Sequence, residues 1–450
     1  MHFNCHFAGR VRGIFGTVIR TFILSVISLP TYSLSEAEIE IYGGERNVVP
    51  LEPSENAQII RSTPPSSDLN TGDSRLSAKT ITHEAIPEKK QKLLRVGPDR
   101  KLKYTSDAAK IARDGYLIEI DSGVYRNDYA RWPQNNLTIR GVGGMAHLQS
   151  TGLIPNRKAI WITRGNNIEI ENIEFSGAAV ENTNGAGIRH EGGNLTLSNT
   201  FFHDNEFSLL SGRLPDADIE ILSSRFWFQK RPARHSHGIY IGEARRFTLM
   251  GSHIKGTDQG HQVKSRALEN HILYNRIEDI QGGNSSRLVD LSNCGFSIVM
   301  GNDLHQAATT RNTNVIGYGS EGCTVRTAKQ KKLYVINNTL VNEAANGTLV
   351  NNHTEGDAFV ANNVVFGRGD FLLGSGVSAN NFREASGNRI PGKWDVPEGS
   401  KAIDSAARMD RFDGLSLIPA GEFTPPAGYR RRLLHGNLDA GSREYSRHHR

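Results

Sequence analysis

Short runs of alternating apolar and polar residues recur through the middle of the chain, between Leu137 and Phe366. Alternation with period two predicts short strands. Each run ends at Asn or another small polar residue, which tolerates unusual backbone angles and so predicts a corner, and a second short apolar run follows. Examples are Ile168-Glu-Ile-Glu-Asn172-Ile-Glu-Phe175, Leu195-Thr-Leu-Ser-Asn199-Thr-Phe-Phe202 and Phe359-Val-Ala-Asn-Asn363-Val-Val365.

The predicted corners lie 23 to 36 residues apart, counted from Gly141 to Asn363. Strands of this length cannot bury a core alone, but coils stacked on one another can. The sequence therefore predicts an all-β, single-stranded parallel β-helix of about nine coils, roughly 40 Å long. A β-propeller or a β-sandwich is the alternative, but a propeller blade needs a longer repeat, and Asn-Gly hairpin turns are scarce here.

The segment before the first coil predicts a capping helix. Ser106 to Gly115 begins with an N-cap candidate, continues with good helix formers and ends at glycine. With the following Tyr116-Leu-Ile-Glu-Ile-Asp-Ser-Gly123-Val-Tyr125, the chain resembles right-handed parallel β-helix proteins of the pectate-lyase-like superfamily. Lys401-Ala-Ile-Asp404-Ser and Asn437-Leu-Asp-Ala-Gly441 look like closing segments of that superfamily, so the resemblance covers about Val96 to Tyr445.

The first part of the chain looks like an export signal. Three arginines precede the apolar stretch Phe22–Leu29, and small residues follow at Ser35-Glu-Ala37. We expect a signal peptide over 1–37 and a secreted or periplasmic protein without stable membrane insertion; a membrane anchor is the alternative. Residues 38–92 are rich in Pro, Ser and charged residues and predict a flexible leader. The β-helix with its cap then spans 93–400, and a closing segment with a basic tail spans 401–450.

The composition agrees with a chain that turns often, and the charge balance limits the classes of partner that the protein can bind. The 450 residues include 46 Gly and 35 Asn, and the net charge is only +6, with 53 Lys plus Arg against 47 Asp plus Glu. This balance excludes a strong nucleic-acid footprint. Removal of the signal would leave Cys294 and Cys323 as the pair able to form a disulfide. We expect a monomer that stands on its own core.

A second strand in each coil gives an alignment of candidate binding residues. Ile188, Ile239, Val263, Val289, Ile316 and Val350 form an expected inward aliphatic row, which turns their neighbours outward. The outward row then contains Arg189, Tyr240, Lys264, Asp290, Gly317 and Asn351. Basic and aromatic groups on adjacent coils suit an extended acidic glycan, because successive side chains can meet successive sugars.

Residues Thr257 to Ala267 resemble the catalytic coil of β-helix polysaccharide lyases of the chondroitinase B and alginate lyase type. The resemblance is carried by Val263-Lys264-Ser265 and the corner at Asn275, and it implies a lysine base. The family also uses an arginine one coil later, where this chain has Asp290; Arg287 and Arg266 are possible substitutes.

Uronate β-elimination needs a group that neutralises the sugar carboxylate, a base for the C5 proton and a donor for the departing O4. We assign Arg266 as neutraliser, Lys264 or His261 as base, and Tyr240 or His261 as donor. Further substrate-binding candidates are Arg189, His237, Asp290, Arg287, Tyr318 and Glu321. His235-Ser-His237 is interpreted as groove lining and not as a metal site.

Several alternatives share these residues. A C5-epimerase performs the same proton abstraction, a glycoside hydrolase would need two carboxylates across the bond, and a non-catalytic β-helix could bind an exopolysaccharide. Related lyases recruit Ca²⁺, for which Glu243, Asp258 and Asp290 are the candidate ligands, but no cofactor is indicated firmly. The first hypothesis remains a lyase acting on an acidic polysaccharide.

Overall fold

A computed structural model describes residues 91–229, 236–324, 327, 330–389, 393–409 and 416–446. The predicted signal peptide, the leader up to residue 90 and His235 lie outside the described residues. Within the described ranges, no helix is long and apolar enough to cross a bilayer.

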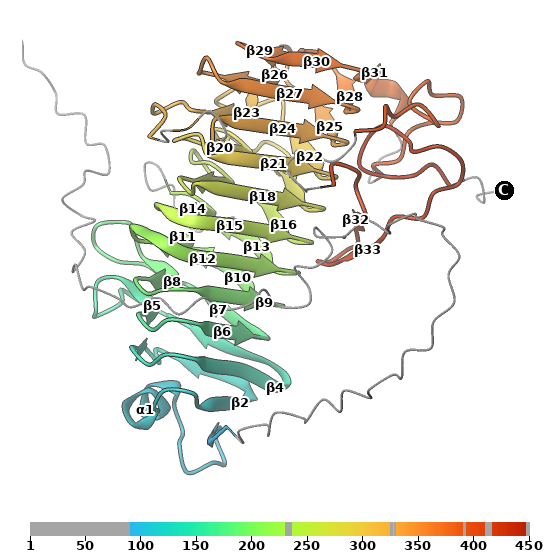
Figure 1. The fold of residues 1–450 in the computed structure, drawn as a ribbon. Helices are drawn as coiled ribbons and strands as arrows, with labels where there is room; N and C mark the ends of the chain where they lie inside the picture. Colours follow the sequence, from blue (N-terminus) through green and yellow to red (C-terminus); the bar gives the residue numbers. More distant parts are fainter. Residues whose placement is uncertain are drawn as a thin grey trace, which may run out of the picture. The chain divides into compact units, whose positions relative to one another are not determined.

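The chain winds through stacked coils whose strands are all parallel to the strands of the next coil (Figure 1). One flank is a ten-stranded sheet in simple coil order. Its strands are β3 (Ala130–Trp132), β5 (Ala159–Thr163), β8 (Ala186–His190), β11 (Phe207–Ser211), β14 (Ile239–Ile241), β17 (Val263–Ser265), β20 (Val289–Leu291), β23 (Asn314–Tyr318), β26 (Thr348–Asn352) and β29 (Asp370–Leu373).

The remaining parallel strands form a 21-stranded sheet that bends at a corner into two layers. The first layer holds β1 (Leu93–Val96), β6 (Ile168–Glu171), β9 (Leu195–Ser198), β12 (Leu214–Leu222), β15 (Ala244–Met250), β18 (Glu269–Leu273), β21 (Phe296–Met300), β24 (Lys332–Ile336), β27 (Asp357–Ala361) and β30 (Val377–Ala379). The second layer holds β7 (Ile173–Ser176), β10 (Phe201–Asn205), β13 (Arg225–Gln229), β16 (His253–Lys255), β19 (Arg276–Glu278), β22 (Asp303–Gln306), β25 (Thr339–Asn342), β28 (Val364–Gly367) and β31 (Phe382–Glu384). The long strands β2 (Leu117–Arg126) and β4 (Leu137–Gln149) run through both layers.

The predicted inward row of the ten-stranded sheet is confirmed, with one coil added. Ile188, Ile239, Val263, Val289, Ile316 and Val350 are fully buried and meet in register. The alignment of β8 directly with β14 was wrong, however, because β11 lies between them and places Leu209 and Leu210 in the two rows. Its sequence is Phe-Ser-Leu-Leu-Ser, and it has the apolar Leu210 at the position where β8, β14 and β17 have Arg189, Tyr240 and Lys264.

The corners between the two layers are held by a ladder of asparagine side chains. The backbone N–H groups of Asn275, Asn302, Asn338 and Asn363 each donate to the side-chain oxygen of the asparagine one coil further on, at 2.9–3.0 Å. The left-handed residue in these corners is the one before, as in Gly301 (φ 68°) and Asn337 (φ 53°). The predicted corner asparagines therefore satisfy buried backbone groups.

The predicted cap is present as the helix α1 (Thr105–Ile111), which is shorter than the sequence suggested. Its Ala108 is fully buried against the first coil. The backbone N–H groups of Thr105 and Ser106 donate to the carboxylate of Asp128, at 2.5 and 3.1 Å. A carboxylate from the loop between β2 and β3 thus caps the helix in place of a residue from the helix itself.

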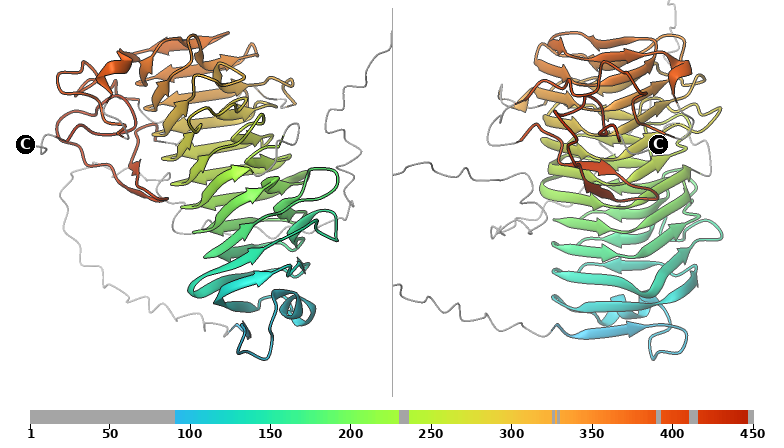
Figure 2. Two further views of the ribbon diagram at one scale, coloured as in Figure 1. Left: turned by 180° about the vertical axis from the view of Figure 1, so that it is seen from behind. Right: turned by 90° about the vertical axis from the view of Figure 1, so that its right-hand side faces the viewer.

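The C-terminal segment lies alongside the coils (Figure 2). It contains the 3₁₀ turn η4 (Ser386–Asn388) at its start and the antiparallel pair β32 (Gly421–Phe423) and β33 (Tyr429–Arg431). Trp394 and Ala440 pack on Val364 and Phe366 of β28. Arg443 forms an ion pair of 2.7 Å with the buried Asp303 of β22, which ties the segment to the second layer.

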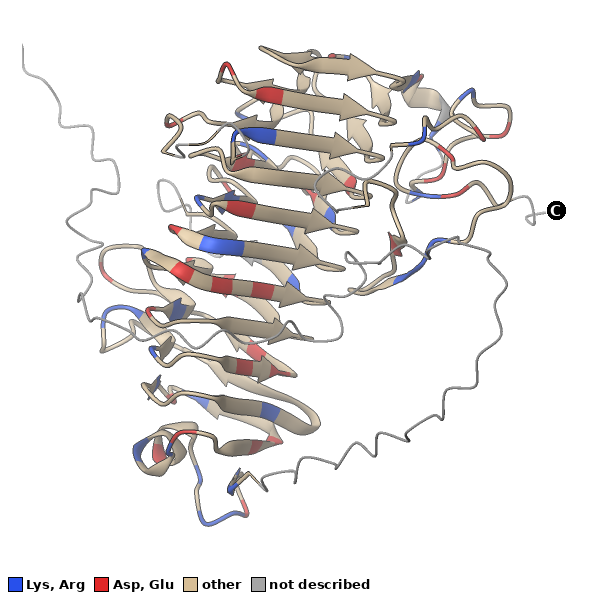
Figure 3. Ribbon diagram, viewed as in Figure 1, with Lys and Arg blue, Asp and Glu red and all other residues tan. Residues whose placement is uncertain are grey.

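Charges of both signs alternate between coils on the first layer (Figure 3). Arg246 of β15 pairs in register with Glu269 of β18 and lies next to Asp218 of β12. This part of the described surface has no uniform basic face.

Candidate active site

The outward row of the ten-stranded sheet brings together three of the predicted catalytic and binding residues. Tyr240 of β14, Lys264 of β17 and Asp290 of β20 are direct register neighbours on successive coils. Only 3%, 7% and 1% of their surfaces are exposed, so other side chains cover the row. We call the cluster built on this row the β14–β20 cluster.

One carboxylate holds two of the cations in this cluster. Glu321 accepts from Lys264 Nζ at 2.5 Å through one oxygen and from the guanidinium of Arg266 through the other. Arg266 also donates to the hydroxyl of Tyr240 and, at 3.0 Å, to the side chain of Asn293. Lys264 and Arg266 therefore share a face, as the period-two pattern predicted, and together they hold the carboxylate of Glu321.

Three rings stack beside these cations. The imidazoles of His237 and His261 lie parallel with centroids 5.0 Å apart, and the ring of Tyr240 stacks on His237 at 5.7 Å. Nδ1 of His237 accepts from the backbone N–H of His261 at 3.0 Å, which fixes the ring stack to the turn before β17. The stack places the imidazole of His261 near the Lys264 side of the β14–β20 cluster.

His261 and Asp290 form a buried imidazole–carboxylate pair without a direct hydrogen bond. Nε2 of His261 lies 3.6 Å from a carboxylate oxygen of Asp290, and its Nδ1 has no hydrogen-bond partner among the described residues. Burial lowers the pKa of His261 to about 4, against the attraction of Asp290, and the charges of Lys264 and Arg287 add to the lowering. The imidazole is therefore neutral at neutral pH.

Asp290 is kept ionised by its neighbours. Burial alone would raise its pKa, but His261, Arg287, Lys264 and the hydroxyl of Ser292 together lower it below the ordinary value. Arg287 donates to it at 2.7 Å. Asp290 stands where the lyases that this chain resembles have an arginine. Its carboxylate is thus a buried anion next to His261, and it can stabilise the imidazolium form of that ring.

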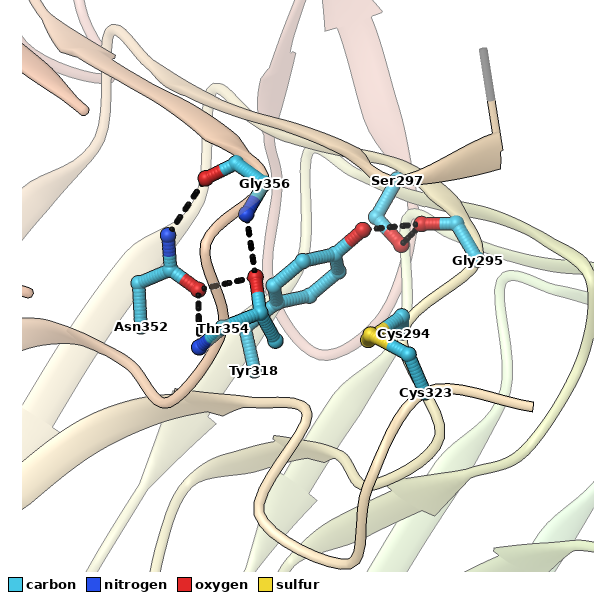
Figure 4. The surroundings of a disulfide bond; sticks show 8 residues. All are labelled: Cys294, Gly295, Ser297, Tyr318, Cys323, Asn352, Thr354 and Gly356. Carbon is cyan, nitrogen blue, oxygen red and sulfur yellow. Dashed lines mark hydrogen bonds between the residues drawn. A yellow bond between two sulfur atoms is a disulfide. The ribbon is translucent and has the colours of Figure 1, made fainter. Parts of the chain in front are cut away.

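A disulfide anchors the loop that carries Glu321. Cys294 and Cys323 are joined, with their Cα atoms 5.2 Å apart, as the sequence had suggested was feasible (Figure 4). Glu321 lies two residues before Cys323, and its backbone N–H donates to the carbonyl of Ser292 at 3.0 Å. Burial raises the pKa of Glu321, and Lys264 and Arg266 outweigh this, so its pKa lies below the ordinary value.

The position of Tyr318 differs from the expectation. We predicted it at the rim of the groove, but its ring is fully buried and its hydroxyl donates to the carbonyl of Gly295 at 2.8 Å (Figure 4). It occupies the inward row after Leu291, where period two turns it into the core. Tyr318 therefore supports the disulfide turn and is not available to a substrate.

Arg189 lies apart from the β14–β20 cluster. In the register of the sheet, Leu210 separates it from Tyr240. Its guanidinium lies 4.0 Å from the carboxylate of Glu191. Phe207 and Leu210 of β11 make the intervening surface apolar, and Ile162 of β5 adjoins Arg189 on its other side. The sequence interpretation did not include Asn293 and Ser320, since each reaches the cluster from a loop whose path the strand pattern does not predict.

The three predicted Ca²⁺ ligands do not converge. Glu243 pairs with Arg213 at 2.7 Å, Asp290 pairs with Arg287, and no group of metal-ligating atoms among the described residues includes Glu243, Asp258 and Asp290 together. Since Ca²⁺ needs several oxygens around one point, these residues do not fit a calcium site.

Comparison with known proteins supports the fold. No protein-family model matches the chain, and no curated protein matches its sequence. A solved structure of the pectate lyase Pel9A is similar, with a TM-score of 0.53 and 13% identity over 79% of this chain and 98% of that chain.

Other similar solved structures overlap less well. The alginate lyase from Paenibacillus sp. str. FPU-7 gives a TM-score of 0.38 and 14% identity over 62% of this chain and 94% of that chain. The GH136 lacto-N-biosidase from Eubacterium ramulus gives a TM-score of 0.42 and 13% identity over 65% of this chain and 68% of that chain. With its parallel coils and capping helix, the chain has the right-handed parallel β-helix fold, as the pectate lyase Pel9A does.

Proposed function

We propose that this protein is a secreted polysaccharide lyase that cleaves a uronate-containing glycan by β-elimination. The observation that carries the proposal is the single carboxylate of Glu321 held by both Lys264 and Arg266. A pair of cations arranged for one carboxylate is what the substrate of this reaction requires, because neutralising the uronate makes its C5 proton acidic. The solved structure of similar fold is a pectate lyase, which supports a lyase acting on a glycan.

In the proposed complex, the uronate carboxylate replaces that of Glu321. The side chain of Glu321 is 40% exposed, whereas the side chain of Lys264 is only 9% exposed. The glutamate therefore covers the cations and can move away from them toward solvent. The resemblance to β-helix lyases implied Lys264 as the base, with His261 as the alternative. Its ion pair with Glu321 supports a carboxylate-binding role for it, together with Arg266.

Neutral His261 then serves as the base. Its imidazole takes the C5 proton, the C5–H electron pair forms the C4–C5 double bond, and the C4–O4 bond breaks. The imidazolium that results is stabilised by Asp290, 3.6 Å from Nε2. The hydroxyl of Tyr240, which is bonded to Arg266, gives its proton to the departing O4. Exchange with water returns both groups to their starting protonation states.

Activity is tested by incubating the mature chain with polygalacturonate, alginate, glycosaminoglycans and bacterial exopolysaccharides. The expected product carries a double bond conjugated with the carboxylate and absorbs in the ultraviolet. Tyr240→Phe and His261→Gln should each lower kcat by about 10²–10⁴-fold, the contribution typical of general acid or base groups.

The matched control is Arg246→Ala, which removes an arginine from an ion pair of 3.0 Å with Glu269 on the first layer, away from the proposed site. This variant should keep full activity. Shortened glycans without the new absorbance would indicate a hydrolase. An altered uronate configuration in an uncut chain would indicate a C5-epimerase, and binding without any product would indicate a non-catalytic exopolysaccharide-binding protein.

A further inference from the structure

A second cluster of chemically active side chains lies on the outer face of the second layer, on three successive coils near the cap. His147 comes from β4, Glu174 from β7 and His203 from β10, and these strands are neighbours in the sheet (Figure 1). None of these residues belongs to the β14–β20 cluster, which lies on the ten-stranded sheet. The cluster is therefore independent of the proposed lyase function.

The three side chains turn their coordinating atoms toward one point. Glu174 Oε1 lies 2.9 Å from His203 Nε2 and 3.4 Å from His147 Nε2, and the three atoms lie within 4.8 Å of one another. Zinc bonds of about 2.0–2.1 Å in tetrahedral geometry imply ligand atoms roughly 3.3 Å apart. Small side-chain rotations would bring these three atoms to the separations that ligands of one shared metal ion have.

A second carboxylate orients one of the imidazoles. Nδ1 of His203 is 2.7 Å from Asp204 Oδ2, which leaves Nε2 as the atom that faces Glu174. This carboxylate–histidine arrangement fixes the ring in metal sites and strengthens the ligand. Asp204 itself lies in the left-handed region at φ 55°, so the backbone turns directly after His203 and returns the carboxylate to its ring.

The side chains of the cluster are also open to an incoming ion. The side chains of His147, Glu174 and His203 are 17%, 22% and 22% exposed. Two imidazoles and one carboxylate are a donor set for borderline-soft divalent metals, whereas Ca²⁺ and Mg²⁺ prefer an all-oxygen set. Three protein ligands leave a fourth position for water.

We propose that His147, Glu174 and His203 bind one divalent transition metal ion of the zinc class, with Asp204 as positioning residue for His203. The ion would cross-link three coils that are otherwise joined by strand pairing. It replaces the hydrogen bonds that Nε2 of His147 makes to Ser176 at 2.7 Å and that Nε2 of His203 makes to Glu174 at 2.9 Å.

The test uses the full chain without a histidine tag, stripped with a chelator and titrated with Zn²⁺ by calorimetry. We expect one tightly bound ion per chain, a rise in Tm on binding, and no competition from Ca²⁺. His147→Asn and Glu174→Gln should weaken binding by at least about 100-fold, and Asp204→Asn by about 10-fold, the loss typical of an outer partner. Co²⁺ should give the intense visible absorption of a tetrahedral site.

The matched control is His253→Asn. His253 forms a His–Glu pair of 2.7 Å with Glu278 on the same layer, but the pair belongs to no three-ligand group among the described residues. This variant should bind Zn²⁺ as the wild type does. The proposal is overturned if the wild type binds no more tightly than the folded His147→Asn and Glu174→Gln variants, or if His253→Asn abolishes binding equally. Catalytic activity plays no part in the readout.

Discussion

Glu321 and Arg266 form an ion pair between two segments 55 residues apart in the chain, and the same glutamate binds Lys264. The two cations of the proposed carboxylate site are therefore occupied by an internal anion before any substrate arrives. A substrate carboxylate must displace this anion, and part of its binding free energy offsets the loss of the internal contacts.

Glu321→Gln is expected to lower KM for the uronate glycan by roughly fivefold, because a half-exposed ion pair contributes about 1 kcal/mol. Initial rates over a range of glycan concentrations measure the change. Glu243→Gln is the matched control, since Glu243 has a similar exposed fraction of 38% and pairs with Arg213. A fall in kcat at constant KM would instead assign Glu321 to the catalytic machinery.

Removal of the disulfide should destabilise the protein. Cys294 and Cys323 close a loop with a sequence separation of 29 residues. Chain entropy predicts that a cross-link of this span contributes about 3–4 kcal/mol. The double variant Cys294→Ser, Cys323→Ser should unfold at a correspondingly lower urea concentration and should not respond to reductant, whereas the wild type should shift toward it on reduction. An unchanged midpoint in the double variant would contradict this role.

Asn302→Ala should break the corner ladder. The fully buried side chain accepts from the backbone N–H of Asn275 at 2.9 Å and donates to the carbonyl of Ile272 at 2.9 Å and to Asn338 at 2.9 Å. Each buried group left without a partner costs about 1–3 kcal/mol, so we expect a total loss of roughly 3–5 kcal/mol in the free energy of unfolding.

Asn135→Ala is the control for the ladder. Asn135 also bridges coils, accepting from the backbone N–H of Asn166 at 2.8 Å, but its hydrogen bonds are exposed to water. This variant should cost less than about 1 kcal/mol. Equal losses in the two variants would show that burial of the ladder does not matter.

The sequence predicted the coils because the alternation and the corners are local signals. Ile239, Val263 and Val289 could be aligned from their own neighbours, and that alignment placed Tyr240, Lys264 and Asp290 in one row. The same pattern failed for β11, whose outward Leu210 is apolar and packs with Ile162 and Tyr240 of other strands. A strand with no polar face carries no alternation to detect.

Contacts made by loops and by the C-terminal segment could not be predicted. The reach of Glu321 to Arg266 depends on the path of the disulfide-linked turn, and the pairing of Asp303 with Arg443 joins residues 140 positions apart. The His147 cluster had a detectable signal, since Glu174 lies outward in Ile173-Glu-Phe175 and His147 is its register partner. The outward residues of the second layer carry this signal in the same way as those of the ten-stranded sheet.

His261 should make the fold less stable as pH falls from about 6.5 to about 4. Its folded pKa is lowered to about 4 by burial, against the opposing attraction of Asp290, with Lys264 and Arg287 adding to the lowering; Glu321 and the stacked His237 also face the ring. In this window the unfolded chain binds a proton that the folded chain does not, so stability rises with pH.

The size of this effect can be isolated by comparing His261→Gln with the wild type. A folded pKa of about 4 against an ordinary 6.5 corresponds to roughly 3 kcal/mol when the window is crossed completely. Between about pH 7 and pH 4.5, the free energy of unfolding measured in urea should fall by roughly 2–3 kcal/mol more for the wild type than for His261→Gln.

Asp290 affects stability in a separate pH range. Its lowered pKa stabilises the folded chain, and this contribution is lost only as the pH falls below about 3.8. His435 is exposed, so His435→Gln is the control variant. Its stability should change with pH as that of the wild type does. Parallel pH profiles for all three proteins would show that the imidazole of His261 is not buried as a neutral group, and would remove the proposed base.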